Sequence, residues 1–173
     1  NGAPSGINTL PSTITSVVAG RINLRNDNSF TNEPLNVASG NTPSGIDLLV
    51  SAAITGTGVT ITKVGTGPML LTGASTFSGG GVIVNAGTLV IGNASALSSG
   101  LLMMNGGAIS NNTGGLFAVA NNIDLQSTTS VGVNTNDTLT LTGLIYDNGG
   151  LTKAGGGTLV LARANTYSGT TTV

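Results

Sequence analysis

The sequence contains neither cysteine nor histidine. Without cysteine, no disulfide can hold the fold, and no thiolate can bind a metal ion or act as a nucleophile. Without histidine, the side chain that most often serves as a general base in enzymes is missing as well. The two absences argue against the commonest catalytic and metal-binding sites, and we expect no catalytic residue, no metal site and no cofactor.

Charged residues are also scarce. They make up 6% of the chain, against roughly a quarter in ordinary globular proteins. Five basic residues against six acidic ones give a net charge of −1, which lacks the basic excess that binds nucleic acid or anionic membranes. The apolar runs are short and alternating, far below the roughly 18 consecutive apolar residues that span a membrane as a helix. We expect no nucleic-acid partner and no direct membrane insertion.

Aromatic residues are few, and tryptophan is absent. Sugar-binding sites commonly use exposed aromatic rings, and Tyr146 is the best candidate for such a ring because the turn-forming residues Asp147, Asn148 and Gly149 follow it. Cell-surface or matrix glycans therefore stay open as partners. The other aromatic residues are expected in the core or at corners: Phe30, Phe77, Phe117 and Tyr167.

The chain is instead rich in threonine, serine, asparagine and glycine, with 28 glycines. Threonine and valine favour strands, whereas asparagine and glycine accept the left-handed conformations of tight turns. Short runs of strand formers alternate with glycine- or asparagine-containing turns, as in residues 59–64, 68–73 and 82–92, and no helical periodicity is visible. This pattern predicts an all-β protein built from many short strands.

A repeat organises the sequence. The stretch from Val59 to Asn85 is largely written again from Gly149 to Val173, at an offset of 90 residues without a gap. Phe77 corresponds to Tyr167, and the identical pairs are Thr62/Thr152, Lys63/Lys153, Gly65/Gly155, Gly67/Gly157, Leu71/Leu161, Ala74/Ala164, Thr76/Thr166, Ser78/Ser168 and Gly79/Gly169. Self-similarity of this kind indicates a repeat architecture.

The shared residues resemble the passenger-associated (autotransporter-associated) β-strand repeat of bacterial surface proteins. The resemblance lies in a Thr-Lys-x-Gly-x-Gly start and a Thr-Tyr/Phe-Ser-Gly end, and Val84 to Leu89 and Leu139 to Gly143 also match the family's flanking pattern. It implies a right-handed parallel β-helix that is secreted or displayed at the bacterial cell surface. It implies no catalytic residue.

Two architectures fit many short strands, an antiparallel sandwich and a solenoid of stacked coils. The repeat favours the solenoid, because each coil must present equivalent side chains to the coil below. With roughly 20 to 25 residues per coil, the repeat offset corresponds to about four coils and the whole chain to about seven or eight. We expect residues 1–173 to form a single β-solenoid.

The repeat residues are expected to have structural roles. We expect the glycines at positions 65, 67, 155 and 157 to adopt positive φ in sharp turns, and Gly79 and Gly169 to belong to the same turn framework. Leu71, Leu161, Ile83 and Val173 should point inward, Phe77 and Tyr167 should lie at corners, and Lys63 and Lys153 should cap corners in solvent.

Carboxylates could still support an enzyme, because β-helices that cleave polysaccharides use clustered acids. Here Asp124, Asp137 and Asp147 are scattered in the sequence, and a pair such as Asp124 and Asp137 could meet on adjacent coils. Solvated turn positions explain these acids more simply. A glycan-active enzyme is thus the least favoured of our three hypotheses.

The second repeat copy stops inside its motif. Reading Val173 onto Asn1-Gly2-Ala3 restores the pattern of Val84-Asn85-Ala86-Gly87 with one residue deleted. This suggests that the chain is one tile of a longer array, made of tandem repeats or of subunits stacked head to tail. We therefore expect an extracellular structural segment of a stalk, fibre or filament whose main partner is itself. The alternative is an adhesin module that binds host or neighbouring cells.

Overall fold

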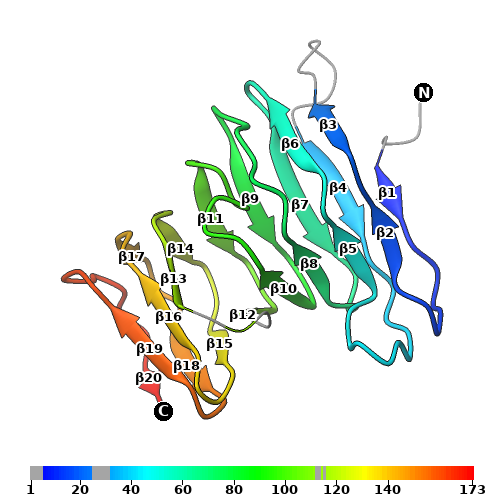
Figure 1. Ribbon diagram of the computed structural model, residues 1–173. Helices are drawn as coiled ribbons and strands as arrows, with labels where there is room; N and C mark the ends of the chain where they lie inside the picture. Colours follow the sequence, from blue (N-terminus) through cyan, green and yellow to red (C-terminus); the bar gives the residue numbers. More distant parts are fainter. Residues whose placement is uncertain (1–5, 25–31, 112–113, 115) are drawn as a thin grey trace.

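The computed structural model describes residues 6–24, 32–111, 114 and 116–173. All regular structure in these residues is β-strand, and every strand pairing is parallel. Successive strands do not pair with each other. Each pairs with a strand about one coil further along the chain, so the strands form ladders that run along a common axis (Figure 1).

Two long ladders form the body of the molecule. Sheet A holds seven strands: β1 (Ile7–Asn8), β4 (Asn32–Asn36), β7 (Thr60–Val64), β9 (Gly81–Val84), β11 (Leu101–Met104), β14 (Ile123–Leu125) and β17 (Ile145–Tyr146). Sheet B holds eight: β2 (Ser16–Val18), β5 (Leu48–Val50), β8 (Met69–Leu71), β10 (Thr88–Ile91), β12 (Ala108–Asn111), β15 (Thr129–Val133), β18 (Leu151–Ala154) and β20 (Thr171–Thr172).

The third side of the solenoid is less regular. It holds β3 (Arg21–Leu24) paired with β6 (Ala53–Gly56), and β13 (Leu116–Val119), β16 (Thr138–Leu141) and β19 (Thr158–Leu161) in a second ladder. Between these ladders, residues 72–80 and 92–100 pass along the third side without forming a named strand. Within the described ranges, five turns therefore have strands on all three sides, slightly fewer than the seven or eight coils expected from length alone.

The sequence prediction of a parallel β-solenoid is thus confirmed, and the antiparallel sandwich is wrong. The coils are unequal in length. Ser16 of β2 pairs with Leu48, 32 residues later, whereas Met69 of β8 pairs with Leu89, only 20 residues later. Charge-poor, glycine-rich corners allow both lengths, because glycine adopts the backbone conformations that sharp turns require.

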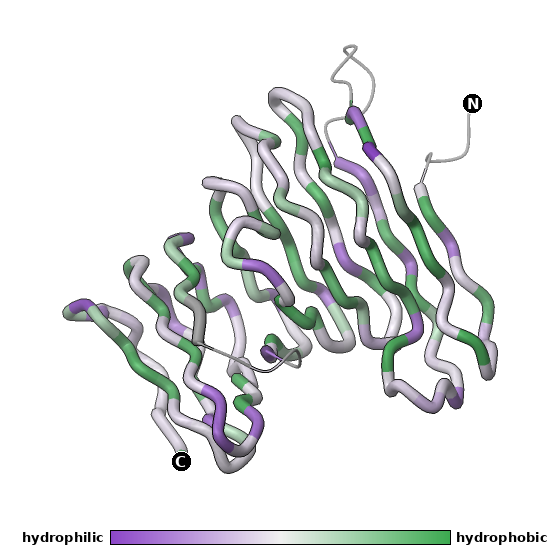
Figure 2. The backbone as a smooth tube through the Cα atoms, viewed as in Figure 1, coloured by the Kyte–Doolittle hydropathy of each residue, from purple (hydrophilic) through white to green (hydrophobic). Residues whose placement is uncertain are grey.

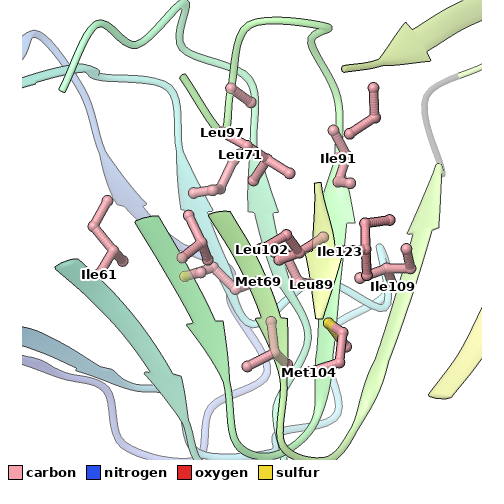
Figure 3. Packing of buried hydrophobic residues seen from close by; sticks show 14 of the residues in the cluster. Ile61, Met69, Leu71, Leu89, Ile91, Leu97, Leu102, Met104, Ile109 and Ile123 are labelled. Atoms are coloured by element: carbon pink, nitrogen blue, oxygen red, sulfur yellow. The ribbon is translucent and has the colours of Figure 1, made fainter. Parts of the chain in front are cut away.

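The core fills the space between the three sides. Buried and half-buried residues alternate along strands such as β15 and β16, as expected when every second side chain points inward. Figure 2 shows hydrophobic segments along strands throughout the stack. Figure 3 shows inward side chains such as Leu71, Leu89, Ile91 and Leu102 pointing toward one another. These four are at most 2% exposed. Stacked aliphatic side chains of this kind each contribute roughly 1.5 to 3 kcal/mol when fully buried.

Candidate functional site

The repeat builds a corner, and a buried lysine lies at its centre. Lys63 ends the inward row of β7 and is 0% exposed. Its Nζ donates hydrogen bonds to the carbonyl oxygens of Val64 (3.1 Å), Gly65 (2.7 Å) and Ala86 (3.1 Å). Val64 and Gly65 belong to its own corner, whereas Ala86 belongs to the corner of the next coil. The expectation that Lys63 caps a corner in solvent was therefore wrong, because the side chain turns inward and joins two successive corners.

The surroundings of Lys63 change its acidity. Burial disfavours the charged ammonium and lowers the pKa of Lys63 from 10.5 to about 8, an effect that the negative charge of Asp47 partly opposes. Asp47 lies one coil below and is itself 7% exposed. At neutral pH the ammonium remains charged, so all three of its protons are available to the corner carbonyls.

The glycines of this corner are needed for two different reasons. Gly65 has φ of +75° and Gly155 has φ of +79°, as expected of a left-handed turn residue. Gly67 and Gly157, in contrast, do not adopt positive φ. A Cβ atom at Gly67 would lie 2.4 Å from the Ala38 carbonyl oxygen, and one at Gly157 would lie 2.1 Å from the Asn134 carbonyl oxygen. These two glycines allow close contact with the coil below, so the prediction of positive φ at them was wrong.

The two repeat copies occupy different sides of the solenoid. In the first copy, β7 on sheet A leads through Gly65 into β8 on sheet B; in the second, β18 on sheet B leads through Gly155 into β19 on the third side. On sheet A, successive coils align Lys63 with Val84, then with Met104 and then with Leu125. The 90-residue offset between the two repeat copies is therefore longer than a whole number of coils, and the second copy falls on a different side. The repeat is therefore a unit of corner structure that can be placed at either corner.

The end of the repeat that contains Phe77 or Tyr167 makes the same backbone hydrogen bonds in both copies, although the two copies lie on different sides. In the first copy, the amides of Thr76 and Ser78 donate to the carbonyls of Ile54 and Gly56, at 2.8 and 2.9 Å. In the second, the amides of Thr166 and Ser168 donate to the carbonyls of Ile145 and Asp147, at 2.9 and 2.8 Å. Between these residues, Phe77 is fully buried and Tyr167 is half-buried against the core, so both rings lie inside the solenoid rather than at its corners.

The end of the second copy is shifted by one residue relative to the first. Thr171 and Thr172 pair with Leu151 and Thr152, which puts Val173 opposite Lys153. Since Val84 lies opposite Lys63, the structural counterpart of Val173 is Val84 and not Ile83. The prediction that Ile83 points inward was wrong, since it faces outward between buried neighbours. Val173 is in register with an inward position but is 95% exposed, because no coil covers it.

The remaining repeat positions follow the prediction in part. Leu71 is buried at 2% exposure, and Leu161 packs against the same core but is half-buried because it lies in the last coil. Lys153 is also half-buried, and its Nζ donates to the Gly155 carbonyl at 2.6 Å. Gly79 has φ of +77°, whereas Gly169 has a close contact instead, since a Cβ there would lie 2.4 Å from the Gly149 carbonyl.

The carboxylates are placed differently from the pair considered in the sequence. Asp124 lies on sheet A and Asp137 precedes β16 at another corner, so these two do not come together. Asp124 instead shares a partner with Asp147 of the next coil, because Gln126 Nε2 donates to both, at 2.7 Å each. No group of three or more acidic side chains that could hold a metal ion occurs in the portion that the structure describes.

Tyr146 lies beside this Gln126 cluster of Asp124, Gln126 and Asp147. It is half-buried rather than fully exposed, and its hydroxyl is hydrogen-bonded to Asp124. Burial and then the charges of Asp124 and Asp147 raise the pKa of Tyr146, and the hydrogen bond acts in the same direction. The polar side chains on this outer face are thus hydrogen-bonded to one another.

Sequence analysis did not identify one further buried polar group. Asn121 is 4% exposed, and its Nδ2 lies within hydrogen-bonding distance of the carbonyl oxygens of Leu97 (3.4 Å), Ser98 (3.2 Å) and Gly100 (2.6 Å). This side chain holds together a part of the third side that has no strand. No local pattern identifies it, because all three acceptors come from the coil below.

The family model of the passenger-associated-transport-repeat matches residues 61–91 and 151–173. The chain thus contains two copies of this repeat, both built into a parallel β-solenoid. No curated protein and no solved structure matches it. The matched ranges are the two corner units described above, each containing its lysine and left-handed glycine.

The matched repeat is one that is associated with autotransporter passengers. A passenger repeat belongs to a secreted or surface-exposed segment, and the β-solenoid fold agrees with that assignment. No helix long and apolar enough to cross a membrane occurs among the described residues.

Proposed function

We propose that this passenger segment is a structural spacer at the bacterial cell surface, forming part of a stalk, fibre or filament. The observation that carries this proposal is the continuity of sheets A and B, whose strands stack from the first coil to the last along one axis. Each further coil lengthens such a stack by about 4.8 Å and repeats the same parallel hydrogen bonding. Length is thus the property that the fold provides directly.

The packing of the repeat supports a structural role along the axis. Lys63 joins successive corners through the Ala86 carbonyl, and aliphatic rows continue through the interior from coil to coil. The carboxylates of Asp124 and Asp147 are held by Gln126. The polar groups therefore connect neighbouring coils with one another.

We further propose that the chain is one tile of a longer linear array. The support is that the corner unit occurs twice, at two different corners, and that both copies belong to the same stack of parallel ladders. Further copies would extend these ladders in the same way.

The spacer proposal can be tested by joining two copies in one polypeptide, with Val173 followed directly by Asn1. Small-angle scattering and electron microscopy should show one rod about twice as long as the single chain, because each coil adds the same rise. The matched control carries a flexible Gly-Ser linker at the junction and should show two rods at variable angles. Two independent rods in the direct fusion would contradict the proposal.

A second candidate function is adhesion, and a groove on the outer face of sheet A favours it. The groove has a volume of about 250 Å³ and is lined mainly by apolar atoms of residues that include Ile83, Leu101 and Met103. If this groove binds a partner on host or neighbouring cells, Ile83→Asp should abolish cell binding without changing the unfolding temperature. Unchanged cell binding, or no cell binding by the native chain, would leave the spacer as the sole function.

A further inference from the structure

Methionine carries the oxidant-sensitive chemistry of this chain. The sequence has no cysteine, so its sulfur atoms are those of three methionines, Met69, Met103 and Met104. Oxidants convert the thioether of methionine to a sulfoxide, which turns a flexible apolar side chain into a polar one. A folded protein limits this reaction to the sulfur atoms that the oxidant can reach. The burial of each methionine therefore decides where oxidation takes place.

The structure separates the three methionines into two kinds. Met69 and Met104 are both 0% exposed, and Figure 3 shows them among the side chains of the core. Met103 precedes Met104 in β11, a strand whose residues alternate between half-buried and buried. Because successive side chains of a strand point to opposite faces of the sheet, Met103 lies on the outer face of sheet A. Two adjacent residues thus place one sulfur outside the solenoid and one inside it.

Met103 lines the groove on the outer face of sheet A, whose volume is about 250 Å³. A water molecule occupies about 30 Å³ in the liquid, so the groove has room for a small oxidant beside this side chain. Two glycines keep the groove open. A Cβ atom at Gly80 would lie 1.9 Å from the Val59 carbonyl oxygen, and one at Gly81 would lie 2.1 Å from the Leu101 carbonyl oxygen. The packing of adjacent coils therefore excludes larger residues from the floor of the groove.

The neighbours of Met103 determine what a sulfoxide would meet. The register of sheet A places Met103 between Ile83 on one coil and Asp124 on the next. Ile83 belongs to the apolar wall of the groove. On the other side, the Asp124 carboxylate accepts a hydrogen bond from Gln126 Nε2 at 2.7 Å and is hydrogen-bonded to the Tyr146 hydroxyl. These donors are already engaged, so a sulfoxide oxygen on Met103 takes its hydrogen bonds from water in the groove.

The reaction needs a peroxide as the oxidant. The Met103 sulfur donates its lone pair to one oxygen of hydrogen peroxide, an S–O bond forms, and the O–O bond breaks. The second oxygen takes the proton of the first and leaves as water, so that the sulfur loses two electrons and the peroxide gains two. Methionine sulfoxide reductases reverse the step. Two thiols then become a disulfide, and the sulfoxide oxygen leaves as water.

We propose that Met103 is a reversible oxidation site through which peroxides convert the groove on sheet A from an apolar surface to a polar one. The fold stays intact because Met103 lies outside the core, while Met69 and Met104 are shielded by the coils around them. The consequence for cell binding rests on the adhesion candidate proposed above: an apolar partner that contacts Ile83 and Leu101 is released when Met103 is oxidised. The oxidation site itself requires no partner.

Peptide mass spectrometry of the native chain after timed exposure to hydrogen peroxide tests the site, with fragmentation to separate Met103 from Met104. Met103 should gain one oxygen at least ten times faster than Met69 or Met104. Unfolding the chain in concentrated urea should make the three rates equal, because burial then no longer protects the inner pair. Circular dichroism of the chain oxidised at Met103 should match that of the untreated chain. Equal rates in the folded chain, or faster oxidation of Met104, would overturn the proposal.

The change in the groove is measured with the dye ANS, whose fluorescence reports accessible apolar surface. Peroxide should lower the signal of the native chain to that of Ile83→Asp, and a methionine sulfoxide reductase with a thiol should restore it. Met103→Leu keeps an apolar side chain without sulfur and should not respond, whereas the matched variant Met104→Leu should respond like the native chain. No response in the native chain, or an equal response in Met103→Leu, would refute the switch. Selective oxidation of Met103 in a chain that binds no cells would contradict the adhesion candidate and still support the oxidation site.

Discussion

At the scale of single residues, Lys63 is the side chain on which the repeat corner depends most. Lys63→Met keeps much of the aliphatic length but leaves three carbonyl oxygens without their donor. We expect the free energy of unfolding at pH 7 to fall by about 1 to 3 kcal/mol, since hydrogen bonds to charged groups are the stronger ones. The matched variant Lys153→Met should cost under about 1 kcal/mol, because that side chain is half-buried. Urea denaturation measures both values, and equal losses would contradict the assignment.

The depressed pKa of Lys63 predicts how stability depends on pH. The folded chain releases the Lys63 proton with a pKa of about 8, whereas an unfolded lysine holds its proton up to about 10.5. Between these values the unfolded chain binds more protons, so the free energy of unfolding rises with pH, by about 3 kcal/mol at most. Below pH 8 this contribution is constant. Comparing native chain and Lys63→Met at pH 7 and pH 10 isolates the effect, and parallel pH profiles would show that Lys63 has an ordinary pKa.

The residue scale also shows where sequence reasoning stops. Leu71 could be assigned to the core because it lies in a short apolar run and recurs as Leu161 in the repeat. The burial of Lys63 could not, because a lysine next to a glycine turn is ordinarily solvated, and its partner Ala86 becomes a neighbour only when the next coil is in place. Asp124 and Asp147 are likewise linked only by the packing of two coils.

At the scale of elements, the unit of this fold is a corner consisting of a strand, a glycine turn and a second strand. The same unit connects sheet A to sheet B in the first copy and sheet B to the third side in the second. We therefore expect the two turns to be interchangeable. Replacing Val64-Gly65-Thr66-Gly67 by Ala-Gly-Gly-Gly, the turn of residues 154–157, should change the free energy of unfolding by less than about 1.5 kcal/mol, mainly through the loss of the Val64 side chain.

Inserting one alanine after Gly65 is the contrasting variant for this corner. An extra residue shifts the register of β8 and turns its inward row, Met69 and Leu71, to the outside. We expect loss of cooperative unfolding by circular dichroism. If the insertion variant unfolded as cooperatively as the variant with the exchanged turn, we would conclude that the corner does not define the register of its strands.

At the scale of the whole molecule, stability should vary along the axis. Each coil contacts only the coils beside it, so stability approximates a sum of coil and interface contributions. Hydrogen exchange measured on dilute protein should protect the amides of the central strands β9 to β12 most and those of β1 to β3 and β19 to β20 least. Uniform protection along the chain would indicate that the ends are sealed.

The sequence by itself determined the class of the fold, a solenoid of short strands with glycine corners and an aliphatic interior. These properties follow from local alternation and from the repeat, which need no knowledge of distant contacts. Only the tertiary structure decided which side each repeat copy occupies, that Lys63 is buried, and which acids share a partner. The physical reason is that one step of the ladder varies from 20 to 32 residues. The side of the solenoid on which a residue lies, and the residues that it contacts on the next coil, therefore depend on the summed lengths of all preceding coils. A local sequence pattern does not contain this information.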